Sequence, residues 1–417
     1  MTRNIFVLYL VSIELDMFMI STIVFLSTLI STIISIVVHK HPRILISNIN
    51  EKFILTHALE KILFIPIGFT SNPIAITILY GAVNITSIFS TIYTNLAIYG
   101  LFEEVDIKDV IAKRTITANI TNILGYILTM FLIYSLPSNV KFQTIYTLGG
   151  LIGVLSTISI LPINLKNVMK AKILEQVSSP ERLFTTSYYF ITLLTSSNLL
   201  GLVWTPFLIR ALKSPDYIVI AVNFAGSIAG IFSSIFWAKT SLKKLRISLG
   251  LASLTPILCI ITHYPILHIG ISAYGGFTFV GANFLGSFLF ARYKNWLGVL
   301  RVSTLMSLIT NLSQLLATPF GLLFQEDYTL LFLASAVVRL LSITVAYLTI
   351  VEVAIVSEED ARTYSQILYR NSLWGYILVT DVVKESIMIT LKVLAIITIF
   401  LLLFIVYRFL FFIMSIS

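Results

Sequence analysis

An apolar run that ends in a cluster of cations constrains this chain more than any other feature. Residues 217–238 carry no charge, and they are followed at once by Lys239, Lys243, Lys244 and Arg246. A transmembrane helix needs about 20 predominantly apolar residues, and cytoplasmic loops carry an excess of lysine and arginine. The pattern therefore predicts a membrane-spanning helix whose C-terminal end faces the cytoplasm.

Similar apolar runs recur along the chain. Only 11% of the residues are charged and 57% are apolar, whereas soluble domains carry about 25% charged residues. We therefore expect an all-α, multi-pass protein of the cell membrane. Spans are predicted at residues 17–38, 53–69, 74–100, 115–136, 144–163, 187–209, 217–238, 248–264, 267–290, 302–324 and 328–351, with a further span at 387–414.

The basic residues between these runs test the predicted topology. Loops on the side of Lys239 hold seventeen lysines and arginines, whereas the loops on the other side hold only Lys141, Arg210 and Lys213. A missed or invented span would mix the two groups, so the distribution supports the map. The net charge of +9 lies in short loops and does not indicate nucleic-acid binding.

The predicted spans fall into two halves that repeat one plan. Asp16 opens a run that ends in His39, Lys40 and Arg43, much as Asp216 opens the run that ends in Lys239, and the later spans pair in order. We predict an N-terminal bundle (1–163), a cytoplasmic linker (164–186), a C-terminal bundle (187–351), a polar interfacial tail (352–386) and an additional transmembrane helix (387–414).

Two parallel helical halves joined by a basic cytoplasmic loop resemble the plan of the major facilitator superfamily. The resemblance covers about residues 1–351 and is carried by the architecture. The loops VVHKHPRI and WAKTSLKKLR keep the cations of the family's loop motif but lack its aspartate and glycine. The resemblance implies two pseudo-symmetric bundles and a substrate cavity lined by the first, fourth, seventh and tenth helices.

The first helix of this plan is incomplete. The chain should break at residues 12–16, where Glu14 and Asp16 interrupt the apolar run, and this leaves only about a dozen apolar residues before the first full span. That segment is too short to cross a bilayer. Either the given sequence starts downstream of the true start, or the protein is a degenerate member of the family.

If the family plan holds, polar and aromatic residues of three spans are the candidates for the cavity wall. Each asparagine has an alternative role in an interhelical hydrogen bond, and this role is favoured for Asn122, Asn223, Asn311 and Gln314. The candidates are Tyr80, Asn84, Tyr93 and Asn95 in 74–100, Asn198 and Trp204 in 187–209, and Tyr274 and Asn283 in 267–290.

Charges inside the spans are few. Arg339 lies in the middle of 328–351 and needs an internal partner or a wet cavity, with anion binding as a further possibility. Glu60 is the candidate for ion coupling, although pairing with a loop cation is the simpler role. Because adjacent helical residues point about 100° apart, we expect Glu60 and Lys61 not to pair with each other.

The leading hypothesis is a secondary transporter that moves a small solute by alternating access between the two bundles. The sequence predicts no enzyme, cofactor or metal site, because no catalytic or metal-ligating constellation is present. Alternatives are a transport-inactive relative that serves as a scaffold or binds a protein partner through its C-terminal span, and a lipid-linked sugar flippase or transferase using Glu103, Glu104 and Asp106. Expected partners are the solute and the lipid bilayer.

Overall fold

The computed structural model describes residues 2–137, 140–165, 168, 180–374 and 377. The chain divides into two compact units, Met1–Arg362 and Thr363–Ser417. The first unit contains the residues of both predicted bundles. The additional transmembrane helix predicted at 387–414 lies outside the described residues.

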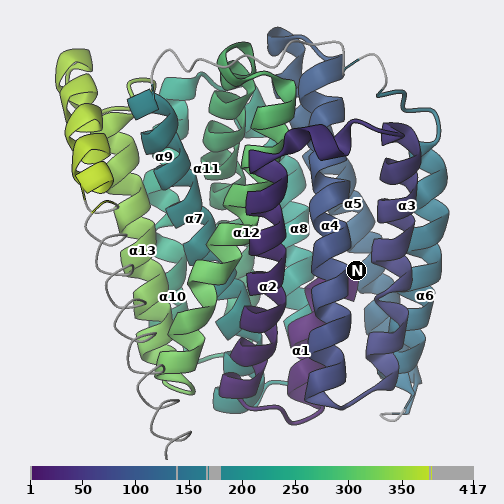
Figure 1. The fold of residues 1–417 in the computed structure, drawn as a ribbon. Coiled ribbons are helices and arrows are strands. Elements are labelled where there is room, and N and C mark those ends of the chain that lie inside the picture. The colour runs from purple at the N-terminus through teal and green to yellow at the C-terminus, as the bar shows by residue number, and fades with distance from the viewer. Residues whose placement is uncertain (1, 138–139, 166–167, 169–179, 375–376, 378–417) are drawn as a thin grey trace, which may run out of the picture. The chain divides into compact units, whose positions relative to one another are not determined.

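The first unit is built from helices (Figure 1). Nine helical segments of the described chain are long and apolar enough to cross a membrane, so the protein is a multi-pass membrane protein. The first half contains η1 (Thr2–Ile5), α1 (Phe6–Ser12), α2 (Met17–Lys40), η2 (Pro42–Leu45), α3 (Ile49–Ile62), η3 (Ile65–Phe69), α4 (Pro73–Leu101), α5 (Glu104–Ser135), α6 (Lys141–Leu155) and η4 (Ser156–Ile160). The second half contains α7 (Pro180–Pro206), η6 (Phe207–Ala211), α8 (Asp216–Ala238), α9 (Leu242–Ala252), α10 (Leu254–Ile261), α11 (Leu267–Leu297), α12 (Val299–Phe324) and α13 (Tyr328–Thr349).

The eleven predicted spans all correspond to helices, and the predicted fold class is confirmed. Two prolines mark breaks, as expected for a residue that lacks an amide donor. The α-helix α7 ends at Pro206 and continues as the π-helical turn η6, while Ser253 separates α9 from α10 three residues before Pro256. The break predicted at residues 12–16 is also present, since α1 ends at Ser12 and Asp16 caps α2 by accepting a hydrogen bond from the Met19 amide.

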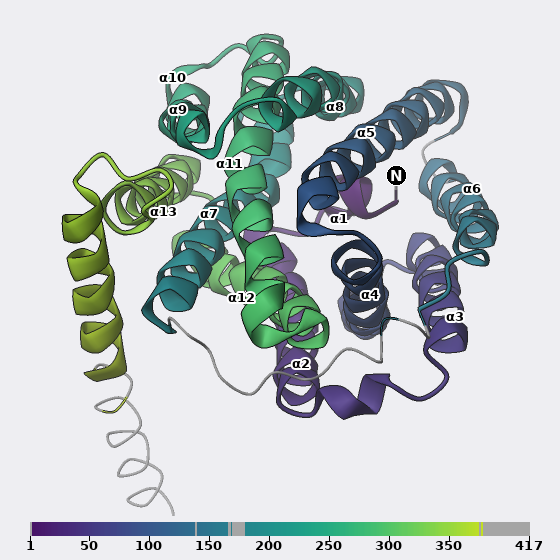
Figure 2. The same cartoon turned by 90° about the horizontal axis from the view of Figure 1, so that it is seen from above.

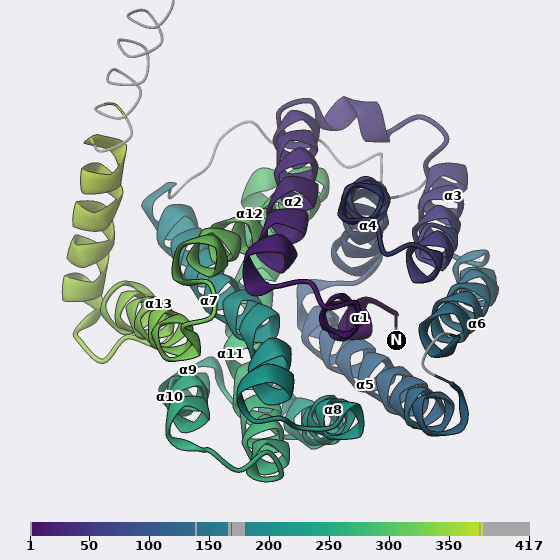
Figure 3. The same cartoon turned by 90° about the horizontal axis from the view of Figure 1, so that it is seen from below.

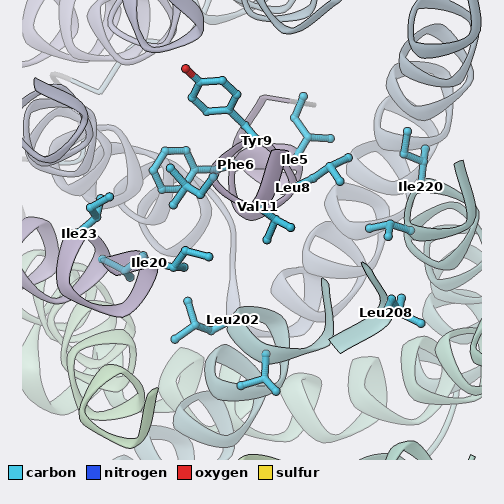
Figure 4. Packing of buried hydrophobic residues seen from close by; sticks show 14 of the residues in the cluster. Ile5, Phe6, Leu8, Tyr9, Val11, Ile20, Ile23, Leu202, Leu208 and Ile220 are labelled. Atoms are coloured by element: carbon cyan, nitrogen blue, oxygen red, sulfur yellow. The ribbon is translucent and has the colours of Figure 1, made fainter. Parts of the chain in front are cut away.

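The short first helix is an integral part of the fold. η1 begins at mid-height of the bundle, and α1 runs from there toward the lower end of the bundle in the view of Figure 1. Seen from below, α1 lies among α2, α4, α5 and α7 (Figure 3). Its apolar side chains are almost all buried. Figure 4 shows Phe6, Leu8 and Val11 on the side of the labelled residues of α2, α7 and α8, and Tyr9 on the other side. Phe6 stacks on Tyr80, and the Tyr9 hydroxyl donates to the Thr70 carbonyl.

Two helix pairs join the halves: α2 packs on α12, and α5 packs on α8 (Figure 2). The α2 face toward α12 is rich in buried serine and threonine, including Ser21, Thr28 and Ser35 at a spacing of seven residues. Ser31 donates to the Asn311 side-chain oxygen, and Asn311 donates to Ser35, each over 3.2 Å. Small polar residues let helices approach closely and hydrogen-bond within the membrane. Asn311 therefore has the interhelical role predicted for it.

Candidate functional site

A cavity of about 730 Å³ lies between the two halves. Its wall comes from η1, α1, α2, α4 and α5 on one side and from α7, α8, α10, α11, α12 and α13 on the other. On α8, which spans Asp216–Ala238, the lining residues lie between 223 and 230, so the cavity is at mid-depth. Its size is within the range of small-molecule sites, about 300–1,000 Å³.

Arg339 reaches the cavity from α13 while its side chain is almost fully buried, with 2% exposed. Its Nε donates to Ser196 Oγ over 3.0 Å, Nη1 to the Ala252 carbonyl over 3.2 Å, and Nη2 to Ser197 Oγ over 2.6 Å. The guanidinium also lies over the Phe279 ring, 5.8 Å from its centroid. These contacts hold the guanidinium of Arg339, which belongs to α13, against α7 and α9.

A second arginine lines the cavity from the other half. Arg3, on η1, donates from Nη2 to Asn84 Oδ1 over 2.9 Å and from Nη1 to Ser87 Oγ over 3.1 Å. Both acceptors are on α4, and the Arg3 side chain remains exposed. Sequence reasoning missed Arg3, although it is the only charged residue before Glu14 in the given sequence.

Five of the predicted site residues lie together in the cavity wall: Tyr80, Asn198, Trp204, Asn283 and Arg339. Two of them also hold helices together. Asn198 donates to Ser313 Oγ on α12 over 3.1 Å, and the Trp204 indole donates to His268 Nδ1 on α11 over 3.0 Å. The substrate role proposed for these residues stays a prediction.

The other predicted residues lie outside the wall. Asn84 contacts the cavity only through Arg3. Tyr93 packs on Phe53 in a separate apolar cluster, and Asn95 is buried nearby on the same helix. Tyr274 donates to the Leu251 carbonyl over 2.6 Å and so ties α11 to α9.

The expectation that Glu60 and Lys61 do not pair was wrong. Their side chains form an ion pair, with Lys61 Nζ 3.2 Å from Glu60 Oε1. The two Cα–Cβ directions diverge, but the long lysine side chain is flexible enough to turn back. Glu60 is buried on α3 and does not line the cavity. A coupling role for it stays a prediction.

Further polar residues in the wall were not among the predicted cavity residues. Asn223 and Gln314 were expected to serve in helix packing, yet both line the cavity. Thr255 also lines it, and its buried hydroxyl has no hydrogen-bond partner in the described chain. Gly201 leaves open space, because a Cβ built there meets nothing within 4 Å.

Hydrogen bonds join the halves on both sides of the cavity. We call the side where α2, α4, α8 and α11 end the basic-loop side (upper in Figure 1). On this side Lys294 donates to the Phe102 carbonyl over 2.8 Å, and Lys108 donates to the Thr240 carbonyl over 2.6 Å. On the opposite side Lys141 pairs with Asp216 at 2.8 Å, and Arg210 donates to the Leu15 carbonyl.

This arrangement, two helical halves around a mid-depth cavity, defines a class of membrane protein that includes many secondary transporters. No known family profile and no curated protein matches the sequence. The structure is similar to the crystal structure of the human organic anion transporter MFSD10 (TETRAN), with a TM-score of 0.56 and 13% identity over 79% of this chain and 83% of that one.

A second solved structure is also similar to this chain. It is a bacterial homologue of the human lysosomal transporter Spinster in an inward-facing and occupied conformation, with a TM-score of 0.51 and 12% identity over 83% of this chain and 91% of that one. Both neighbours are major facilitator superfamily transporters. This chain therefore has the fold of the major facilitator superfamily.

Proposed function

We propose that the protein is a secondary transporter that moves a small solute across the membrane by alternating access between its two halves. The observation that carries the proposal is the mid-depth cavity, which is walled by both halves and flanked by contacts between them on both sides. A rocking motion would break one set of contacts while keeping the other, and this would expose the cavity to one side at a time.

The contacts on the two sides are chemically suited to such an exchange. Lys108 and Lys294 donate to backbone carbonyls, while Lys141 and Asp216 form a partly exposed ion pair. Each side has only a few of these polar contacts, so a rocking motion would break a small number of them at a time.

The motion can be tested before the solute is known. Gly201→Cys places a thiol in the open cavity, and Cys259→Ser removes the single buried cysteine. In sealed proteoliposomes of known orientation, a membrane-impermeant maleimide should label this cysteine from either side. Lys108→Met should increase labelling from the basic-loop side, and Asp216→Asn should increase labelling from the opposite side.

Gly270→Cys is the matched control, because Gly270 also has open space around it but lies outside the cavity wall. Its labelling should not respond to Lys108→Met or Asp216→Asn. Labelling of Gly201→Cys from one side only, unchanged by both substitutions, would contradict alternating access.

A transport-inactive scaffold is the second function that we consider. The packing of α2 on α12 and of α5 on α8 would also suit halves that hold a static cavity. A static cavity in the labelling experiment would support this alternative, whereas exchange between the two sides would exclude it.

A further inference from the structure

The charged side chains that line the cavity in the described chain are all positive. Among the described residues that line it are two arginines, Arg3 and Arg339, and no aspartate, glutamate, lysine or histidine. A charge within the membrane is costly unless it is paired or lies in a water-filled cavity. Two cations from opposite halves therefore face one space without a protein counter-charge in its wall.

The groups that accept hydrogen bonds from Arg339 do not neutralise its positive charge. All three hydrogen-bond acceptors are uncharged: two serine hydroxyls and one backbone carbonyl. A guanidinium has five N–H donors, so the three bonds leave two available, one on Nη1 and one on Nη2. A structural role alone would be better served by a neutral donor, because burying a charge without a partner has a high free-energy cost.

Arg3 has the same chemistry in the other half. Asn84 and Ser87 accept one hydrogen bond each from its Nη atoms, and both are uncharged. Three of its five donors, including Nε, are left for another partner. Arginine binds carboxylate, sulfonate and phosphate oxygens through paired N–H groups, so both arginines are suited to an anion.

The rest of the wall is suited to an organic molecule. Phe6, Tyr80, Tyr126, Trp204 and Phe279 contribute aromatic surface, and asparagine, glutamine, serine and threonine side chains contribute neutral polar groups between them. The volume of about 730 Å³ far exceeds that of a single inorganic ion. An aromatic or aliphatic body would pack against these rings while the charged group lies against an arginine.

We propose that the cavity binds a small organic anion, whose carboxylate, sulfonate or phosphate group is held by Arg339 and Arg3. The inference rests on the proposed function for its physiological meaning, but the binding site stands on the charges of the wall. Arg339 is the fixed contact. Arg3, which is exposed and tied to α4 alone, is the contact that can adjust to the ligand.

Three probes of one shape test the charge preference: 1-naphthalenesulfonate, 1-naphthalenemethanol and 1-naphthylmethylammonium. Binding to the purified full-length protein in nanodiscs is measured by calorimetry, with chloride as an inorganic control. The sulfonate should bind at least about tenfold more tightly than the alcohol, since a charge-assisted hydrogen bond contributes that much, and the ammonium should not bind.

Variants assign the preference to the two arginines. Arg3→Gln should weaken sulfonate binding about tenfold or more and leave the affinity for the alcohol unchanged, while Arg3→Lys should weaken it less. Arg339→Lys keeps the buried charge and should also weaken sulfonate binding, because lysine cannot form the same fork of hydrogen bonds. Arg43→Gln, which removes an exposed arginine outside the cavity, is the control and should bind normally.

The outcomes separate this inference from the proposed function. Equal binding of the sulfonate and the alcohol, no binding of any naphthalene probe, or binding of chloride only would overturn the organic-anion site. So would normal sulfonate affinity in Arg3→Gln and in Arg339→Lys. Sulfonate binding that depends on the arginines, together with a static cavity in the cysteine-labelling experiment, would support the site and contradict transport.

Discussion

The two halves present their arginines to the cavity in different ways. Arg339 belongs to a full transmembrane helix, is 2% exposed and is held by groups from α7 and α9. Arg3 belongs to a four-residue 3-10 helix, is exposed, and is held by α4 alone. One half therefore offers the cavity a fixed cation and the other half an adjustable one.

The same contrast holds for the helices that carry the two arginines. α13 and α7 pack along their length, and Ser196 and Ser335 exchange buried hydrogen bonds between them. Arg3 is carried by the short helix η1, which leads into the seven-residue α1. These two helices are held by their buried apolar side chains, among which Phe6 stacks on Tyr80 and Tyr9 packs on Tyr146.

The strongest test of this comparison is Arg339→Ala against Arg3→Ala. Arg339→Ala removes three hydrogen bonds from a charged group in a buried site, so we expect a loss of about 3 kcal/mol or more in stability. Arg3→Ala should cost less than about 1 kcal/mol, because the side chain is exposed. Thermal unfolding in detergent, followed by intrinsic fluorescence, measures both, and equal losses would remove the distinction.

A second test asks whether α1 anchors Arg3. Phe6→Ala leaves a void beside Tyr80 and should destabilise the protein by about 2 kcal/mol, mainly through lost packing, because lipid solvates apolar groups as well as protein does. Phe18→Ala on the exposed face of α2 is the control and should be nearly neutral. The probe affinity of Phe6→Ala should also fall, since Phe6 lines the cavity and its packing supports the segment that carries Arg3.

The smallest effect is expected from Asn84→Ala. This substitution removes one hydrogen bond to Arg3 and should cost about 0.6 kcal/mol, a typical value for polar pairs between membrane helices. Sulfonate binding should change severalfold at most, because Ser87 still accepts from Arg3. A loss of binding as large as that of Arg3→Gln would show that Asn84 itself contacts the ligand.

The sequence predicted the helices better than the cavity. The helical spans follow from apolar length and the break at residues 12–16 follows from its two acidic residues, both of which are local features, and the structure confirms them. Arg339 was conspicuous because a charge in the middle of a span is rare. Arg3 was missed because it stands next to the start of an apolar run, where a cation usually marks a membrane boundary.

Which polar residues face the cavity depends on tertiary packing. Tyr80 and Tyr93 occur on the same helix, but Tyr93 lies nearer the end at which Lys294 of the other half contacts the Tyr99 and Phe102 carbonyls. The halves contact each other there, and Tyr93 packs in an apolar cluster and does not line the cavity. Helical periodicity gives the face of a residue but not the depth at which two bundles separate.

Counterflow of radiolabelled 1-naphthalenesulfonate into proteoliposomes loaded with the unlabelled compound tests the central claim most directly. The account predicts transient accumulation of label. Gly201→Phe should abolish it by filling the cavity, and Gly270→Phe, placed in open space outside the wall, should leave it intact. No accumulation above that of protein-free liposomes, or equal accumulation in both variants, would contradict the account.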